Sequence, residues 1–239
     1  DRILESSEIR ELAGLQGFSQ IPHYPDWWDF PASLQYEYLL GIPDSDFSPL
    51  ALGQLKYLAA SAGAHLDVAL ASIGGAGPAI ASMVAAWPSS GHPDDALAAN
   101  LGQLKHVTAV IYDRLIAIGY ASDYPWVGGT PDDFALANIG QAKFLFAFDL
   151  TSFDTSEVNI LGDGIPDAWK VAQGLNPFIL DNDDDGLPDW FEVQHGLDPL
   201  DPDDASAPSP LPGIDWLTYY RLNHEALARY ALTGAGNGV

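Results

Sequence analysis

One acidic segment of twelve residues, Asp181–Glu192, constrains the possible fold of this chain more than any other feature of its sequence. Its sequence, DNDDDGLPDWFE, fits every position of the loop pattern D-x-D-x-D-G-x5-E, in which oxygen ligands surround a divalent cation. The segment holds six carboxylates, and each close pair costs about 4 kcal/mol at roughly 4 Å and an effective dielectric near 20. A bound cation is the simplest reason to keep them together. We predict a calcium site here, the alternative being a flexible acidic turn.

Calcium takes about six to eight oxygen ligands, which defines the residues expected to hold it. Gly186 permits the sharp turn that brings the oxygens around one point. The groups predicted to supply these oxygens are Asp181, Asp183, Asp185, the backbone carbonyl of Leu187, Asp189 directly or through water, and a bidentate Glu192.

The phrase that ends the acidic loop also occurs 22 residues earlier. Gly186–Pro199 reads GLPDWFEVQHGLDP, and Gly164–Pro177 reads GIPDAWKVAQGLNP. A tandem repeat of fixed period predicts stacked copies of one small unit. Each copy is expected to hold a loop and a short helix, and in the second copy this helix covers Asp189–His195 and ends at Gly196.

These features make the segment Asn159–Asp204 resemble the bacterial thrombospondin type 3-like calcium-binding repeats, whose units run acidic loop, Gly-Leu/Ile-Pro-Asp, short helix, Gly-Leu-Asp/Asn-Pro. The resemblance covers about a fifth of the chain. It implies calcium-dependent, rod-like or spacer structure in secreted and cell-surface proteins. It also carries the role of metal ligand over to Asp181, Asp183, Asp185, Asp189 and Glu192.

The first copy departs from this pattern, because Leu161 and Lys170 stand where two ligands are required. A complete independent site is therefore not expected there, and its remaining candidate ligands are Asn159, Asp163 and Asp167. In such repeats, acids of one unit can complete the metal site of a neighbouring unit. A further hypothesis is therefore a second ion, bound downstream of the main loop. Its candidate ligands are Asp198, Asp201, Asp203 and Asp204, and the alternative is a charged linker.

A second repeat lies in residues 1–150, where the segments LGQLK (52–56), LGQLK (101–105) and IGQAK (139–143) recur. Pro-Asp-Asp segments at 93–95 and 131–133 precede two copies and predict helix starts, with Thr130 as a cap. The spacing of five apolar residues predicts one buried helix stripe over Leu97, Leu101, Leu104, Ile111 and Leu115. The motif resembles the Gly-Gln-Leu-Lys helical repeats of large secreted bacterial proteins, a resemblance that depends on five residues per copy.

The repeated motif predicts three contacts. A glycine inside a helix costs about 1 kcal/mol relative to alanine, so its recurrence indicates close helix–helix approach. The adjacent glutamine is expected to bond a neighbouring backbone. Lys56, Lys105 and Lys143 are expected to reach water or pair with the Asp-Asp segment of a neighbouring repeat, in preference to binding an anionic ligand.

Charge and composition exclude several classes of protein. With 33 acids against 9 bases and a net charge of −24, the chain is repelled by nucleic acid and anionic membranes. It has no cysteine, so disulfides and thiolate metal sites are excluded. The segment Val68–Trp87 carries no charged side chain. Its glycines and alanines nevertheless predict two short buried helices joined by a glycine turn rather than a membrane span. The chain begins with Asp1, and we expect it to be cut from a longer protein.

We found no catalytic motif, and the prediction is a protein without enzymatic activity, although the many carboxylates leave a glycosidase pair open. We predict a mainly α fold with little or no β-sheet: a helical-repeat bundle (1–150), calcium-binding loop and short-helix repeats (151–204), and a linker with a C-terminal helix over 214–232 and a loose tail (205–239).

The function predicted from the sequence is an extracellular, secreted or cell-surface calcium-binding module that serves as a spacer, adhesive unit or subunit of a larger assembly. Its partners would be calcium and other protein chains or surface glycans. One alternative is a carbohydrate-binding or carbohydrate-cleaving protein that uses Trp27 and Trp28. The other is a self-assembling fibre subunit or homo-oligomer.

Overall fold

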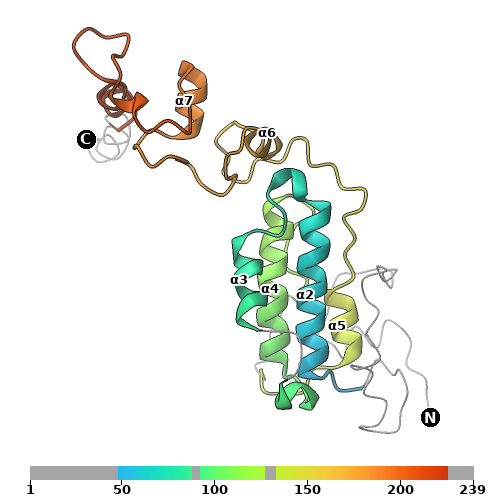
Figure 1. Cartoon of the computed structure of the whole chain (residues 1–239). Helices are drawn as coiled ribbons and strands as arrows, with labels where there is room; N and C mark the ends of the chain where they lie inside the picture. The colour runs from blue at the N-terminus through green and yellow to red at the C-terminus, as the bar shows by residue number, and fades with distance from the viewer. Residues whose placement is uncertain (1–47, 88–91, 127–132, 226–239) are drawn as a thin grey trace, which may run out of the picture. The chain divides into compact units, whose positions relative to one another are not determined.

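The structure of the chain is a computed structural model that describes residues 48–87, 92–126 and 133–225 (Figure 1). These residues are mainly helical and form no strand, only isolated β-bridges, which confirms the predicted mainly α fold class. The chain divides into two compact units, Asp1–Val158 and Asn159–Val239.

The unit boundary differs from the predicted boundary at residue 150. The hydroxyl groups of Ser72 and Thr155 form a hydrogen bond of 2.8 Å, and the rings of Tyr120 and Phe153 meet edge to face at 5.8 Å. These contacts hold residues 151–158 on the helical unit. Residues 205–239, predicted to form a separate part, belong to the second unit.

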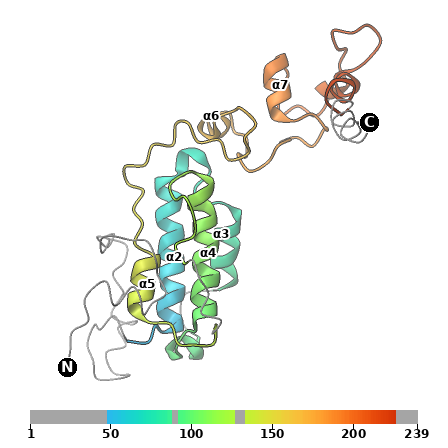
Figure 2. The same cartoon turned by 180° about the vertical axis from the view of Figure 1, so that it is seen from behind.

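The first unit is a bundle of helices in which α2 and α4 run side by side (Figures 1 and 2). Leucine, isoleucine and valine side chains of these two helices are fully buried between them, at the spacing of three to four residues that a buried helix stripe requires. The elements of this unit are α2 (Leu52–Ala69), η3 (Ala71–Ile73), α3 (Pro78–Ala86), η4 (Pro93–Ala96), α4 (Leu101–Ala117) and α5 (Ile139–Leu145).

The repeated glycine–glutamine motif starts the helices rather than lying inside them. In α4, the Asn100 amide donates to Gln103 Oε1 (2.9 Å) and the Gln103 amide donates to Asn100 Oδ1 (2.8 Å). Asn138 and Gln141 repeat this capping box at α5 with the same two distances, 2.9 and 2.8 Å. The glutamine does bond a backbone amide, but that amide belongs to the residue three positions before it and not to a neighbouring helix, so the bond defines a helix start and not a register between helices.

The predicted start of the second helix was wrong. Pro93–Ala96 forms a separate 3-10 turn, Leu97 is 57% exposed, and the helix begins only at Leu101. Gly102 does lie close to another part of the chain, as predicted. A Cβ atom placed on it would be 3.2 Å from the carbonyl oxygen of Asp133. The neighbour is thus the segment before α5 and not another helix. The expected cap Thr130 and Pro131 lie outside the described residues.

Three short extended segments, one before each copy of the motif, close into a ring. The Ala99 amide donates to the Leu50 carbonyl (2.7 Å), the Ala137 amide to the Ala99 carbonyl (2.9 Å) and the Leu50 amide to the Ala137 carbonyl (2.8 Å). All three residues are fully buried. Each copy therefore donates to one neighbour and accepts from the other, so the three helix starts form a closed, pseudo-threefold arrangement.

Two of the motif lysines tie neighbouring copies together. Lys56 Nζ pairs with Asp95 at 2.7 Å, and Lys105 Nζ pairs with Asp133 at 2.8 Å, so each lysine reaches the Asp-Asp segment of the next copy. Each ammonium also lies over an indole ring, Trp87 at 5.9 Å for Lys56 and Trp126 at 5.4 Å for Lys105. The predicted pairing is confirmed for these two lysines.

The uncharged stretch before Trp87 folds as the end of α2, the 3-10 turn η3, a glycine turn and α3. Gly74, Gly75 and Gly77 have positive φ angles of 88°, 65° and 86°, which supply the turn. Across the described parts of the chain, every helix is too short or too polar to cross a membrane.

The second unit consists of short helices on loops: α6 (Asp167–Ala172), α7 (Asp189–His195), η5 (Asp204–Ser206), α8 (Trp216–Tyr220) and the π-helical turn η6 (Arg221–Glu225). The C-terminal helix begins at Trp216 because Asp215 caps it, accepting from the Thr218 amide at 2.7 Å. Its bounds are thus later than the predicted start at 214. Trp216 packs against Leu187, Phe191 and Ala205 and forms the core of this unit.

Candidate metal centre

The 22-residue repeat of the sequence is also a repeat of backbone conformation. Gly164 and Gly186 have φ angles of 87° and 94°, and Gly162 and Asp184 have φ angles of 66° and 63°. Asp184 is the only residue other than glycine with a positive φ angle in the described ranges. The two loops therefore follow the same path, although only one of them has the complete ligand pattern.

Hydrogen bonds within the unit follow the same period and extend it into a third copy. The Asn176 amide donates to Asn182 Oδ1 at 2.8 Å, and 22 residues later the Asp198 amide donates to Asp204 Oδ2 at 2.8 Å. Asp204 therefore occupies in the third copy the place of Asn182 in the second. This position brings its carboxylate back to the acidic loop.

The structure gathers five carboxylates into two groups that share Asp185. In each group the ligand oxygens lie within 4.8 Å of one another, a spacing that suits a single bound ion. The first group is Asp181, Asp183 and Asp185, and the second is Asp185, Glu192 and Asp204. Asp204, which the sequence suggested only as a ligand of a second ion, therefore lies beside the carboxylates of the main loop. Glu192 reaches this loop from the first turn of α7.

Five carboxylate oxygens in these groups are buried and have no hydrogen-bond partner in the described part of the chain. They are Asp183 Oδ2, Asp185 Oδ2, Asp204 Oδ1 and both Oε atoms of Glu192, whose side chain is fully buried. The other oxygens of the cluster accept backbone amides; Asp181, for example, accepts from Asp184 at 2.8 Å and from Gly186 at 2.9 Å. Buried polar atoms are normally paired, so convergent unpaired oxygens indicate a ligand.

The electrostatics of the cluster agree with this interpretation. Burial, followed by the charges of Asp183, Asp185 and Asp204, raises the pKa of Glu192 to about 8. Burial and the charge of Asp185 raise the pKa of Asp183 to about 6. Burial also raises the pKa of Asp185, and the amides of Leu187 and Ala205 partly offset that effect. Without a cation, Glu192 is therefore mostly protonated at neutral pH, and Asp183 and Asp185 ionise less readily than ordinary aspartates.

Asp189, predicted to reach the ion directly or through water, lies outside both metal groups. Its fully buried carboxylate accepts the Asn182 amide at 2.9 Å and the Asn182 side-chain amide at 2.6 Å. Asp167 does the same in the first copy, where it accepts the Ile160 amide at 3.2 Å. These aspartates hold the loop against the helix start, because each loop amide needs a buried acceptor there.

The remaining predicted metal ligands lie outside the two carboxylate groups. Asp198 and Asp201 accept the amides two residues ahead, at Leu200 and Asp203, both at 3.2 Å, so they shape turns. The carbonyl of Asp203 accepts the Ser206 hydroxyl at 2.8 Å. Leu187, expected to offer its carbonyl, has its side chain buried in the core beside Phe191.

The first loop carries a different arrangement. Asp163 forms an ion pair with Lys170, and the two side chains are 3% and 0% exposed. Asn159 Oδ1 is buried without a hydrogen-bond partner among the described residues. Asp163 and Asp167 belong to neither of the two carboxylate groups that could hold a metal in that part of the chain.

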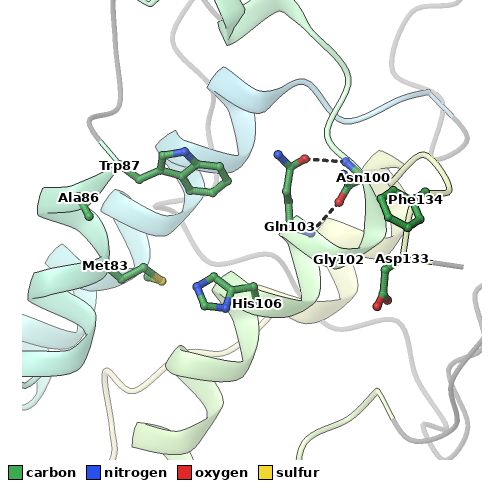
Figure 3. Close-up of a pocket in the computed structure, with 9 residues that line it drawn as sticks. All are labelled: Met83, Ala86, Trp87, Asn100, Gly102, Gln103, His106, Asp133 and Phe134. Atoms are coloured by element: carbon green, nitrogen blue, oxygen red, sulfur yellow. Dashed lines mark hydrogen bonds between the residues drawn. The ribbon is translucent and has the colours of Figure 1, made fainter. Parts of the chain in front are cut away.

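A separate cavity of about 520 Å³ lies in the helical unit, between α3 and the start of α4 (Figure 3). Met83, Trp87 and His106 border it, together with Phe134 from the segment before α5. Residues 88–91 and 127–132, which adjoin Trp87 and Asp133, lie outside the described residues, so the cavity gives no basis for assigning a ligand. Trp27 and Trp28, on which the carbohydrate alternative depends, also lie outside them.

Comparisons with protein-family models, with curated proteins and with solved structures find no match to this chain. Functional inference therefore depends on the acidic cluster itself.

Proposed function

We propose that this chain is a calcium-binding structural module of secreted or cell-surface proteins, in which Ca²⁺ makes the second unit rigid. Two observations support the proposal best. Five carboxylate oxygens of Asp183, Asp185, Glu192 and Asp204 are buried and unpaired among the described residues, and these residues belong to the two carboxylate groups that share Asp185. The resemblance of Asn159–Asp204 to thrombospondin type 3-like repeats agrees with it. The rigid unit would serve as a spacer or adhesive part of an extracellular assembly.

The chemistry of the ligands favours calcium over other cations. Both metal groups contain carboxylates alone, without histidine, and the chain has no cysteine. Oxygen ligands select hard cations over zinc, copper or nickel. Magnesium usually keeps several waters and uses only one or two carboxylates, whereas calcium accepts many flexible protein oxygens. A cluster of five carboxylates therefore suits Ca²⁺ best.

The position of the cluster explains how an ion would stabilise the fold. Glu192 follows the core residue Phe191, and Asp204 precedes the core residue Ala205. A cation between their carboxylates joins the loop, α7 and η5, and it removes the repulsion between buried charges. Binding to the folded state alone stabilises it by about 2.7 kcal/mol at a calcium concentration of about 100 times Kd.

The proposal is tested with Glu192→Gln and a matched control, Asp184→Asn, in the same loop. Asp184 is exposed and belongs to neither metal group, and asparagine tolerates its φ angle of 63°. We expect calcium to raise the melting temperature of the wild-type chain and of Asp184→Asn above the value in chelator. Glu192→Gln should lose most of this increase.

Thermal melting followed by circular dichroism, with calcium and with chelator, measures all three proteins. Equal midpoints for the wild-type chain under the two conditions would contradict the proposal. An equal loss in Asp184→Asn would show that general loop acidity, and not the buried cluster, is responsible.

A further inference from the structure

Lys170 stands in the first loop where Glu192 stands in the second. Both are the fourth residue of a short helix, and both carbonyls accept the leucine amide five residues ahead at 2.9 Å, from Leu175 and Leu197. Both side chains are fully buried. A buried cation in one copy thus takes the place of a buried anion in the other.

The partner of this lysine is the equivalent of Asp185. Asp163 Oδ1 accepts the Ile165 amide at 3.0 Å, just as Asp185 Oδ1 accepts the Leu187 amide at 2.7 Å. The remaining oxygen differs: Asp163 Oδ2 accepts the Lys170 ammonium, whereas Asp185 Oδ2 is one of the five unpaired oxygens. The ammonium of Lys170 therefore contacts the oxygen whose counterpart lacks a partner in the second loop.

The charges of the two loops fit this difference. Segment 159–170 contains the acids Asp163 and Asp167, and the second of these is satisfied by the Ile160 amide. Leu161 replaces the carboxylate that corresponds to Asp183. With Lys170 included, segment 159–170 carries a net charge of −1, against −6 for segment 181–192. The Lys170 ammonium is paired with Asp163, so the first loop has far less negative charge for a metal to neutralise.

We propose that the Lys170 ammonium is a built-in cation that takes the place of calcium in the first repeat. Residues 159–176 then keep their fold at any calcium concentration, while the second repeat depends on the metal. The comparison with the second loop rests on the proposed function, but the buried Lys170–Asp163 pair does not. The second unit would therefore combine a calcium-independent repeat with a calcium-dependent one.

Two variants of the full chain test this inference in the Glu192→Gln background, where the calcium response of the second loop is removed. Lys170→Met keeps the apolar stem and removes the charge. We expect it to lower the melting midpoint by at least about 5 °C, equally in calcium and in chelator, because Asp163 is left buried and uncompensated. An unchanged midpoint would overturn the proposal.

The second variant, Leu161→Asp with Lys170→Glu, installs the two carboxylates that the first loop lacks. We expect it to be less stable than its background in chelator and to regain stability, measured by circular dichroism, when calcium is added. Lys170→Met should not respond to calcium. Failure of calcium to stabilise the double substitution would overturn the equivalence of ammonium and metal. A full calcium response in Glu192→Gln alone would instead contradict the proposed function.

Discussion

Replacing Asp185 with asparagine is expected to abolish the calcium response of the second unit. Asp185 belongs to both metal groups, so an ion bound in either group would contact its carboxylate. In the wild-type chain the Leu187 amide donates to Asp185 Oδ1 at 2.7 Å. The side-chain oxygen of asparagine can accept the same hydrogen bond, so the turn is kept. We expect calcium affinity to fall at least about 100-fold, which corresponds to about 2.7 kcal/mol, when measured by titration calorimetry.

The same substitution should not destabilise the metal-free protein. It removes one of the buried charges that raise the pKa of Glu192, so the melting midpoint in chelator should stay equal or rise. A matched control is Asp201→Asn, because Asp201 is exposed and outside both groups, and asparagine keeps its bond to the Asp203 amide. Equal calcium affinity in Asp185→Asn and Asp201→Asn would contradict the assignment of the cluster.

The stability of the metal-free protein should increase as pH falls, opposite to its behaviour in calcium. Burial and the neighbouring acids raise the pKa of Glu192 to about 8 in the folded chain, from an ordinary value of 4.5. Between these values the folded state binds more protons than the unfolded state, so its stability falls as pH rises. The slope approaches about 1.4 kcal/mol per pH unit, and Asp183, with a pKa of about 6, adds to it at lower pH.

Bound calcium reverses this sign, because the ligands must be deprotonated to hold the metal and acid then competes with it. Denaturant unfolding at a series of pH values from about 5 to 8, in calcium and in chelator, measures both slopes. Glu192→Gln should flatten the slope in chelator. Two slopes of the same sign in the wild-type chain would contradict a metal site at Glu192.

The acidic cluster could be predicted from the sequence because its ligands lie in one loop with a known spacing. The pattern does not reveal which oxygens the protein itself satisfies, such as those of Asp189, which accept the backbone and side-chain amides of Asn182. Asp204 could be placed by extending the 22-residue register one step beyond Asn182. Lys170 was read only as the loss of a ligand, since a sequence pattern does not show that its ammonium reaches Asp163.

The helical unit shows a different limit. The spacing Asn-x-x-Gln at Asn100 and Asn138 is a capping box, a local signal that marks these residues as helix starts. The ring through Leu50, Ala99 and Ala137 could not be predicted in this way, because it joins backbone atoms that lie far apart in the sequence. Local chemistry defines the helix ends, whereas the closure of the three copies depends on long-range pairing.

The central claim is tested most directly by crystals of the chain grown in calcium, with anomalous scattering used to locate the ions. We predict an anomalous peak bounded by the carboxylates of Asp183, Asp185, Glu192 and Asp204, with oxygens at roughly 2.3–2.6 Å from it. No peak should lie beside Asp163 and Lys170. Density explained by water alone between Asp185 and Glu192, at a calcium concentration of about 10 mM that saturates sites of this class, would contradict the account.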